Sequence, residues 1–291
     1  MNKKSKAIIF MILSASSFSV MQLAVKLSNK IPMMEQVFVR NFFTLFIGFF
    51  IAKLHKVDFY FGKKENKKAL LFRGILGYLG IVMYFYASRN MFAADATLLH
   101  RSSPFFVVIF SALFLNEKIT KAHICALLLA MLGAICVIRP SFSSDIFPAL
   151  IGALSAASAG GAYTIISYLR GKEDNGVIIL TFSIISCLLT LPFMLAGQFV
   201  IPNLYEAFML FCIGLFAAGG QIFLTFAYKN APAGEVSIYN FSGIIVSSLL
   251  GYFVLNEKLD FMSILGIVII ITAAIIMFNY RKKVEGFIKN G

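Results

Sequence analysis

The sequence predicts an all-α polytopic membrane protein, with ten transmembrane helices arranged as two inverted five-helix repeats. Hydrophobic residues fill 59% of the 291 positions and charged residues only 13%. The mean hydropathy of +0.86 is far above that of a soluble domain. Apolar runs of about 20 residues, enough to cross a hydrocarbon core of roughly 30 Å, recur along the chain. Ten such spans leave no room for a soluble domain among them.

A duplicated pattern is the second observation. Adding 140 to each position from Gly74 to Ile119 gives Gly214 to Leu259, and ten of these 46 aligned positions are identical. Leu-Asn-Glu-Lys occurs at both 115–118 and 255–258. Because each half has an odd number of spans, the second half must enter the membrane in the opposite sense to the first. We expect a first repeat at 1–140, a second at 149–280 and a basic tail at 281–291.

The first span is expected from Ala7 to Leu27, after the basic segment MNKKSK. Ser14, Ala15 and Ser16 resemble the cleavage site of a signal peptide. The apolar run continues well past them, however, and is longer than the roughly 7 to 15 residues of a signal peptide. We therefore interpret it as a retained span.

The other nine spans follow with short connections, so consecutive helices should be antiparallel neighbours. Arg139-Pro140 ends the fifth helix, since proline cannot continue it. The spans are expected at Met34–Leu54, Ala69–Arg89, Asp95–Asn116, Lys121–Ile138, 149–169, 177–197, 206–229, 233–255 and 261–279.

The positive charges follow the alternation of the spans. Nineteen Lys and Arg, Arg73 among them, fall at the ends that share a side with the N-terminus, against five at the opposite ends. Arg40 and Arg101 lie inside spans. This asymmetry predicts that both termini are cytoplasmic. It also accounts for the net charge of +13 through orientation in the lipid bilayer, with no nucleic-acid partner.

The fourth span carries the strongest functional candidates. His100 and Arg101 lie about six residues inside it, roughly 8 to 9 Å below its outer end. An ionised side chain in hydrocarbon costs at least about 2.5 kcal/mol, so such a group normally faces a cavity or a partner. Arg101 could instead reach outward to water or neutralise Asp95 or Glu235. His100 could bind a solute, carry a proton or donate to a nearby carbonyl.

Further polar residues lie inside other spans. Arg40 occupies the second span, and stripes of neutral polar groups occur in the first and eighth. Each neutral group could equally make an interhelical hydrogen bond. The candidate substrate-binding residues are Gln22, Arg40, Tyr84, Asp95, His100, Arg101, Tyr163, Gln221, Tyr239 and Asn240.

The charged candidates indicate the kind of solute. The two arginines and the histidine favour a metabolite that carries a carboxylate or a phosphate. Asp95 and Glu35 would instead attract a cation, and an amino acid satisfies both. The sequence has no phosphate-binding loop, no H-E-x-x-H and no G-x-S-x-G, so we expect no ATP hydrolysis, no cofactor and no metal. A membrane enzyme or receptor built on the same bundle is the alternative.

The stretch SSPFFVVIFSALFLNEKIT, with the ten spans and the five-plus-five duplication, resembles the EamA-type transporters of the drug/metabolite transporter superfamily. In the ninth span Asn256-Glu257-Lys258 is kept, but Ile244 replaces Pro104, so the proline that would kink this helix is missing. The resemblance implies a central cavity between two four-helix halves, with the fifth helix of each half outside. It also implies that the Leu-Asn-Glu-Lys ends are structural.

Together these observations predict a secondary transporter in the bacterial inner membrane. The solute is expected to be a small polar metabolite, an amino acid or a related organic ion, moved by alternating access and exported rather than imported. Proton antiport, facilitated exchange and uniport all fit the sequence. No pattern in it indicates an oligomeric state.

Overall fold

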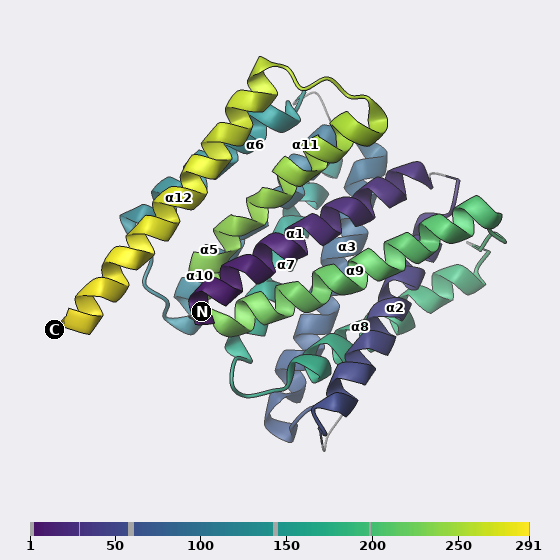
Figure 1. The fold of residues 1–291 in the computed structure, drawn as a ribbon. Coiled ribbons are helices and arrows are strands. Elements are labelled where there is room, and N and C mark those ends of the chain that lie inside the picture. The colour runs from purple at the N-terminus through teal and green to yellow at the C-terminus, as the bar shows by residue number, and fades with distance from the viewer. Residues whose placement is uncertain (1–2, 29, 58–60, 142–144, 198, 291) are drawn as a thin grey trace.

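The computed structural model describes residues 3–28, 30–57, 61–141, 145–197 and 199–290, which form helices joined by short connections (Figure 1). Ten helical segments are long and apolar enough to cross a membrane. The elements are α1 Lys3–Leu27, α2 Met33–Leu54, η1 Lys64–Asn66, α3 Lys67–Asn90, α4 Ala93–Arg101, α5 Ser103–Leu115, α6 Lys121–Ile138, α7 Ile146–Tyr168, α8 Asn175–Leu195, α9 Leu204–Asn230, α10 Ala233–Ser237, η2 Ile238–Phe241, α11 Ser242–Leu255 and α12 Phe261–Asn290. The expected spans are confirmed, and the predicted basic tail continues α12 as far as Asn290.

Two of the ten spans are broken helices. The fourth span breaks at Ser102, and Pro104 lies in the first turn of α5, as proline permits. The ninth span also breaks, although Ile244 replaces the proline, because residues Ile238–Phe241 form a 3-10 turn between α10 and α11. The sequence carries no signal for this second break, so its symmetry with the first is a finding of the structure.

Helices of the first half pack mainly against helices of the second (Figure 1). The main pairs are α1 with α9, α2 with α8 and α3 with α7, while α6 and α12 form a separate pair at the edge of the bundle. In that edge pair the backbones approach closely at two glycines. A Cβ on Gly133 would lie 2.7 Å from the Gly266 carbonyl oxygen, and one on Gly266 would lie 2.5 Å from that of Gly133. Small residues allow such close packing in membranes.

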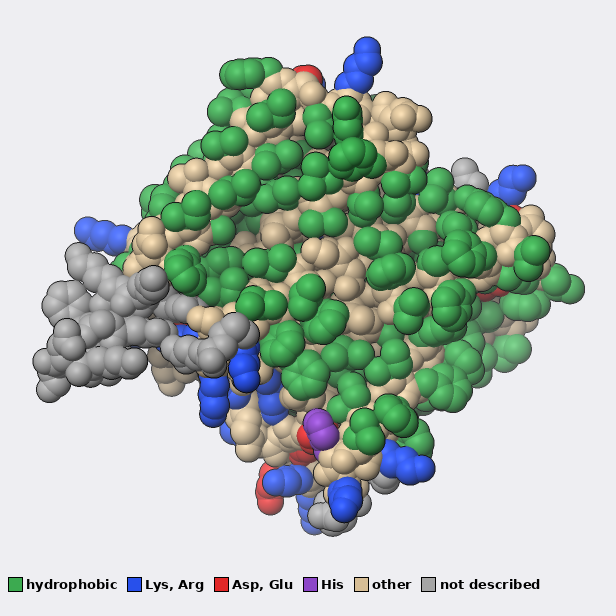
Figure 2. Space-filling view, in the orientation of Figure 1, with side chains coloured by type: hydrophobic (Ala, Val, Ile, Leu, Met, Phe, Trp, Pro, Cys, Tyr) green, Lys and Arg blue, Asp and Glu red, His purple; other side chains and the backbone are tan. Residues whose placement is uncertain are grey.

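The surface is apolar around the middle of the bundle. Large side chains such as Phe46, Leu128 and Leu132 are 56%, 52% and 55% exposed, which suits contact with lipid tails. Figure 2 shows hydrophobic side chains covering the middle of one face, with Lys and Arg gathered at its margins. A bundle of this kind is a multi-pass membrane protein.

The spans alternate in direction, so the bundle has two ends, named here after residues of α1. The Lys4 end holds the start of α1, the connection from α5 to α6 and the start of α10. The Lys26 end holds the last turn of α1, the start of α4 and the connection from α11 to α12.

Candidate functional site

A cavity of about 700 Å³ lies between the two halves. It reaches the Lys26 end, because Lys26 and Glu257 line it and have side chains that are 61% and 55% exposed. Its polar lining residues are Gln22, Lys26, Arg40, Arg73, Tyr84, Ser88, Thr97, His100, Arg101, Ser103, Tyr163, Gln221, Asn240 and Glu257. A volume of 300 to 1,000 Å³, roughly, is usual for a small-molecule site.

Three buried arginines dominate this cavity. Arg40 on α2, Arg73 on α3 and Arg101 on α4 are 8%, 1% and 7% exposed. Counted along their helices, Arg40 and Arg101 lie roughly 10 to 12 Å inside the Lys26 end, and Arg73 lies about 9 Å inside the Lys4 end. All three charges are therefore well inside the bundle.

None of the three arginines has a carboxylate partner within the described residues. The ion pairs that the structure shows there join other groups. Arg101 makes only two long hydrogen bonds of 3.5 Å, donated to the Asn240 carbonyl and to Gln22 Oε1. The Nε atom of Arg40 and the Nε and Nη1 atoms of Arg73 have no partner among the described atoms. The cavity thus holds positive charge that this part of the protein does not neutralise.

Aromatic and amide side chains surround the arginines. The Arg73 guanidinium lies 4.3 Å from the centre of the Phe182 ring, a cation–π contact that suits an arginine without an acid. His100 shares a hydrogen bond of 3.0 Å between its Nδ1 and Ser155 Oγ, and its ring packs 4.6 Å from Tyr84. Tyr163 stacks on Tyr228. These contacts orient the polar groups and leave the guanidinium donors open.

Eight of the ten predicted site residues line this cavity. They are Gln22, Arg40, Tyr84, His100, Arg101, Tyr163, Gln221 and Asn240. They come from six helices and from η2, so the fold collects residues that the sequence scatters over more than 200 positions.

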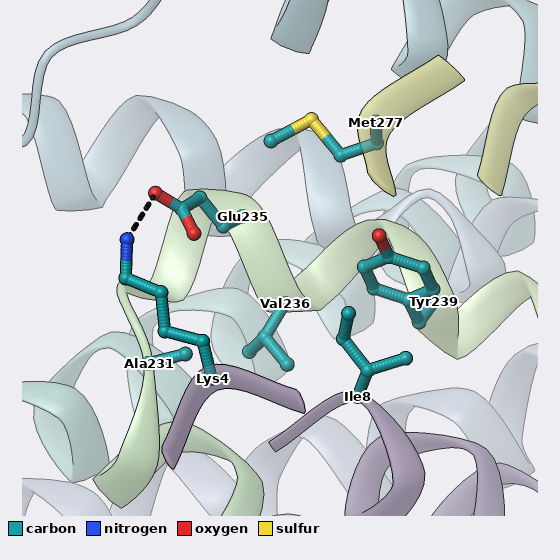
Figure 3. A pocket seen from close by; sticks show the side chains of 7 residues that line it. All are labelled: Lys4, Ile8, Ala231, Glu235, Val236, Tyr239 and Met277. Atoms are coloured by element: carbon teal, nitrogen blue, oxygen red, sulfur yellow. Dashed lines mark ion pairs between the residues drawn. The ribbon is translucent and has the colours of Figure 1, made fainter. Parts of the chain in front are cut away.

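Asp95 and Tyr239 are not among the residues that line the cavity. Asp95 accepts hydrogen bonds of 2.7 and 3.0 Å from the backbone N–H and the hydroxyl of Ser141, in the segment after α6. Neutralisation of Arg101 by Asp95 was one of the alternatives for this arginine, and no ion pair joins the two among the described residues. Tyr239 lies beside a crevice of only about 10 Å³ near the Lys4 end (Figure 3). Asn240 follows Tyr239 directly in the sequence and in η2, but it lines the large cavity, whereas Tyr239 lines the crevice.

Arg73 is the buried charge of the site that is not among the predicted site residues. Other polar lining residues that were not predicted are Lys26, Ser88, Thr97, Ser103 and Glu257. The charge asymmetry assigns Arg73 to the end of a span, although the expected span Ala69–Arg89 already contains it, and α3 begins six residues before Arg73 and carries it inside. Gly77 is a signal that could have found it, since a Cβ there would lie 2.3 Å from Arg73 Nη1. A glycine one turn after an arginine in an apolar run makes room for the guanidinium to fold along the helix.

A bundle of ten spans with a charged, solute-sized cavity between its halves defines a membrane transport protein. The chain belongs to the EamA-like transporter family, which its sequence matches over residues 5–139 and 146–279. It is a secondary transporter of small metabolites and not an enzyme.

Named relatives agree with this class. The chain is 34% identical over 278 residues to the pseudopaline exporter CntI of Pseudomonas aeruginosa, covering 94% of this chain and 96% of the relative. It is 25% identical over 252 residues to the S-adenosylmethionine uptake transporter of Rickettsia bellii, covering 84% and 86%. It also resembles a crystal structure with a TM-score of 0.84 at 16% identity, covering 97% of this chain and 99% of the other, which shows the shared fold. With bacterial transporters among its relatives, the chain is a multi-pass inner-membrane protein.

Proposed function

We propose that this protein exports small organic acids that carry two or more carboxylate groups, acidic amino acids and their derivatives among them, by alternating access. The observation that carries the proposal is the set of three buried arginines without a carboxylate partner among the described residues. A buried charge is stable only when it is paired, so a cavity with three such cations is suited to a ligand that supplies the anions.

The geometry of arginine narrows the solute class. A guanidinium presents parallel N–H donors that fit a carboxylate in a bidentate way. Glu257 lines the cavity but already accepts a hydrogen bond of 2.7 Å from Lys26, so it neutralises a lysine rather than an arginine. Three arginines would leave a monocarboxylate with unneutralised charge around it. A solute with several carboxylates balances the site better.

Direction and orientation rest on separate observations. The relative at 34% identity is named as an exporter, and that name supports export here. The excess of Lys and Arg at the ends shared with the N-terminus favours a cytoplasmic Lys4 end, even with Arg73 removed from that count. On this orientation the cavity opens away from the cytoplasm, as expected for one of the two states of an exporter. Cysteines placed at the exposed Lys64 and Lys258 should then label from opposite sides, and labelling from one side would contradict the orientation.

The solute class is tested by counterflow in sealed liposomes. Labelled citrate and L-glutamate should exchange, whereas leucine and lysine should not. Arg73→Gln should abolish the exchange, and Arg89→Gln should leave it unchanged because Arg89 lies exposed on the same helix. Exchange of leucine or lysine in preference to the acids would overturn the proposal.

A further inference from the structure

The two Leu-Asn-Glu-Lys turns have the same backbone. Asn116 adopts φ 54° and ψ 30°, and Asn256 adopts φ 55° and ψ 28°, both in the left-handed region. After each asparagine the glutamate N–H donates to a carbonyl six residues earlier, at 3.2 Å for Glu117 and at 3.0 Å for Glu257. The two carboxylates therefore leave their turns in equivalent positions of the two repeats.

Glu117 joins the two halves at the Lys4 end. Its two carboxylate oxygens each accept a hydrogen bond of 3.0 Å, one from the Ala233 N–H and one from the Gly234 N–H, at the start of the ninth span. Arg170 lies 3.8 Å from the same carboxylate. Lys4 pairs with Glu235 at 3.6 Å beside this contact, and the crevice that these two residues line has a volume of about 10 Å³ (Figure 3). The Lys4 end is closed, and Glu117 is central to its closure.

Glu257 makes no such contact with the described residues at the Lys26 end. Its carboxylate accepts from Lys26 at 2.7 Å, and both side chains are exposed at the mouth of the cavity. Subtracting 140 from Ala233 and Gly234 gives Ala93 and Ala94, which begin the fourth span. Ala94 and Glu257 line the same cavity. The equivalent partners of Glu257 are thus present across the opening.

The start of the fourth span has the geometry of the start of the ninth. The residue before it, Phe92, has φ −57° and ψ 130°, and the residue before the ninth, Pro232, has φ −52° and ψ 140°. Neither Phe92 nor Pro232 supplies a side-chain cap. At the ninth span Glu117 binds the first two N–H groups. At the fourth span no described side chain takes the corresponding place.

We propose that Glu117 and Glu257 are alternating latches of the two ends. In the conformation described, Glu117 holds the Lys4 end shut. In the opposite conformation Glu117 releases Ala233 and Gly234, while Glu257 leaves Lys26 and binds the N–H groups of Ala93 and Ala94 to shut the Lys26 end. This rests on the alternating access of the proposed function, but not on its solute class.

The latches can be tested without any solute, in purified detergent-solubilised protein whose four cysteines are replaced by alanine. Ile81→Cys reports the open cavity, and Val236→Cys, at a position only 1% exposed beside the crevice, reports opening of the Lys4 end. Both are labelled with a bulky maleimide. Glu117→Gln removes charge-assisted hydrogen bonds, so labelling of Val236→Cys should rise by about tenfold and labelling of Ile81→Cys should fall. Glu65→Gln, an exposed glutamate at the same end, is the matched control and should change neither rate.

Lys26→Met is a more specific test of the latches than Glu117→Gln, because Lys26 is exposed and its replacement should not destabilise the hydrophobic core. Freeing Glu257 should favour closure of the Lys26 end, so labelling of Val236→Cys rises. The rise should vanish when Glu257→Gln is added, and Lys258→Met should produce none. The latch is refuted if Lys26→Met does not raise the labelling of Val236→Cys, or if that rise persists when Glu257→Gln is added. It is also refuted if Glu117→Gln and Glu257→Gln change the labelling of Val236→Cys in the same direction. A failed counterflow assay with normal labelling would refute the solute class alone.

Discussion

The two halves share a fold but contribute different kinds of side chains to the cavity. All three buried arginines and His100 come from the first half. At the positions 140 later, Arg101 is replaced by Phe241 and His100 by Asn240, while Arg73 is replaced by Ile213. Around the buried arginines the second half contributes neutral groups, Tyr163, Phe182, Gln221 and Asn240, and its one charged lining residue, Glu257, lies at the mouth paired with Lys26.

This difference teaches that a symmetric scaffold can hold an asymmetric site. The duplicated spans provide equivalent breaks and turns, as the alternating access proposed above requires. On the proposed function a single solute is bound by one set of charges, so these need to be present in only one half. We expect the first half to hold the anion and the second half to shape the space around it.

Loss of an arginine in the first half should have the largest effect. Arg101→Gln should lower kcat/KM for citrate counterflow by about 10- to 100-fold, since each charge-assisted hydrogen bond contributes about 1.5 to 3 kcal/mol. Arg101→Lys should already lose most of this activity, because lysine lacks the planar fork. Initial rates in liposomes measure both. Equal activity of Arg101→Lys and the wild type would show that only charge matters at this position.

A substitution in the second half that only displaces Arg101 sterically should have an intermediate effect on counterflow. A Cβ on Gly243 would lie 2.6 Å from Arg101 Nη1, so Gly243→Ala should displace the guanidinium and lower the counterflow rate by about tenfold. Gly219→Ala is the matched control, since its Cβ would meet only Ser17 Oγ at 3.7 Å, and it should retain full activity. If both variants behave alike, the second half does not position Arg101.

The smallest effect is expected between the edge helices, far from the cavity. Arg139, after α6, donates to Asp260, before α12, and this hydrogen bond together with those from Ser263 lowers the pKa of Asp260 to about 2. Because the folded pKa is lower than the ordinary value, the pair stabilises the protein above about pH 4 and loses this contribution as the pH falls toward 2.

Melting temperatures at several pH values test this edge contact. The wild type should exceed Asp260→Asn slightly at pH 6, and the difference should shrink below pH 4. Both side chains are about half exposed, so the difference should also decrease in high salt. A difference that is constant between pH 6 and pH 3 would mean that the charge of Asp260 contributes nothing.

The sequence predicted the scaffold better than the charges inside it. Hydropathy and the 140-residue repeat can be read directly from the sequence, so the ten spans were predictable, and Pro104 indicated a kink in the fourth. The second break was not, because η2 replaces a proline with a turn that tertiary packing supports. Arg73 was not predicted as a site residue because it lies close to the start of the expected span Ala69–Arg89, next to a basic stretch, where an arginine that reaches the surface and one that turns inward have the same sequence pattern.

Asp95 shows the limit of pairing charges by distance along one helix. Arg101 is six residues away, but Ser141 reaches Asp95 from the connection after α6. Only the assembled bundle brings that connection into contact with it. The eight residues that do line the cavity were predictable because polar side chains inside apolar spans have few other places to lie.

The central claim is that the three buried arginines form the binding site of an anionic solute. Arg73→Met tests this claim most directly. The measurement is the melting temperature of wild type and variant, each with and without citrate. Methionine removes a buried, unpaired charge while keeping most of the apolar volume, so the variant alone should melt at a higher temperature, with a gain of about 1 to 3 kcal/mol in unfolding free energy. Citrate should stabilise the wild type and leave the variant unchanged. A variant that melts at a lower temperature, and that citrate stabilises as much as the wild type, would contradict the account.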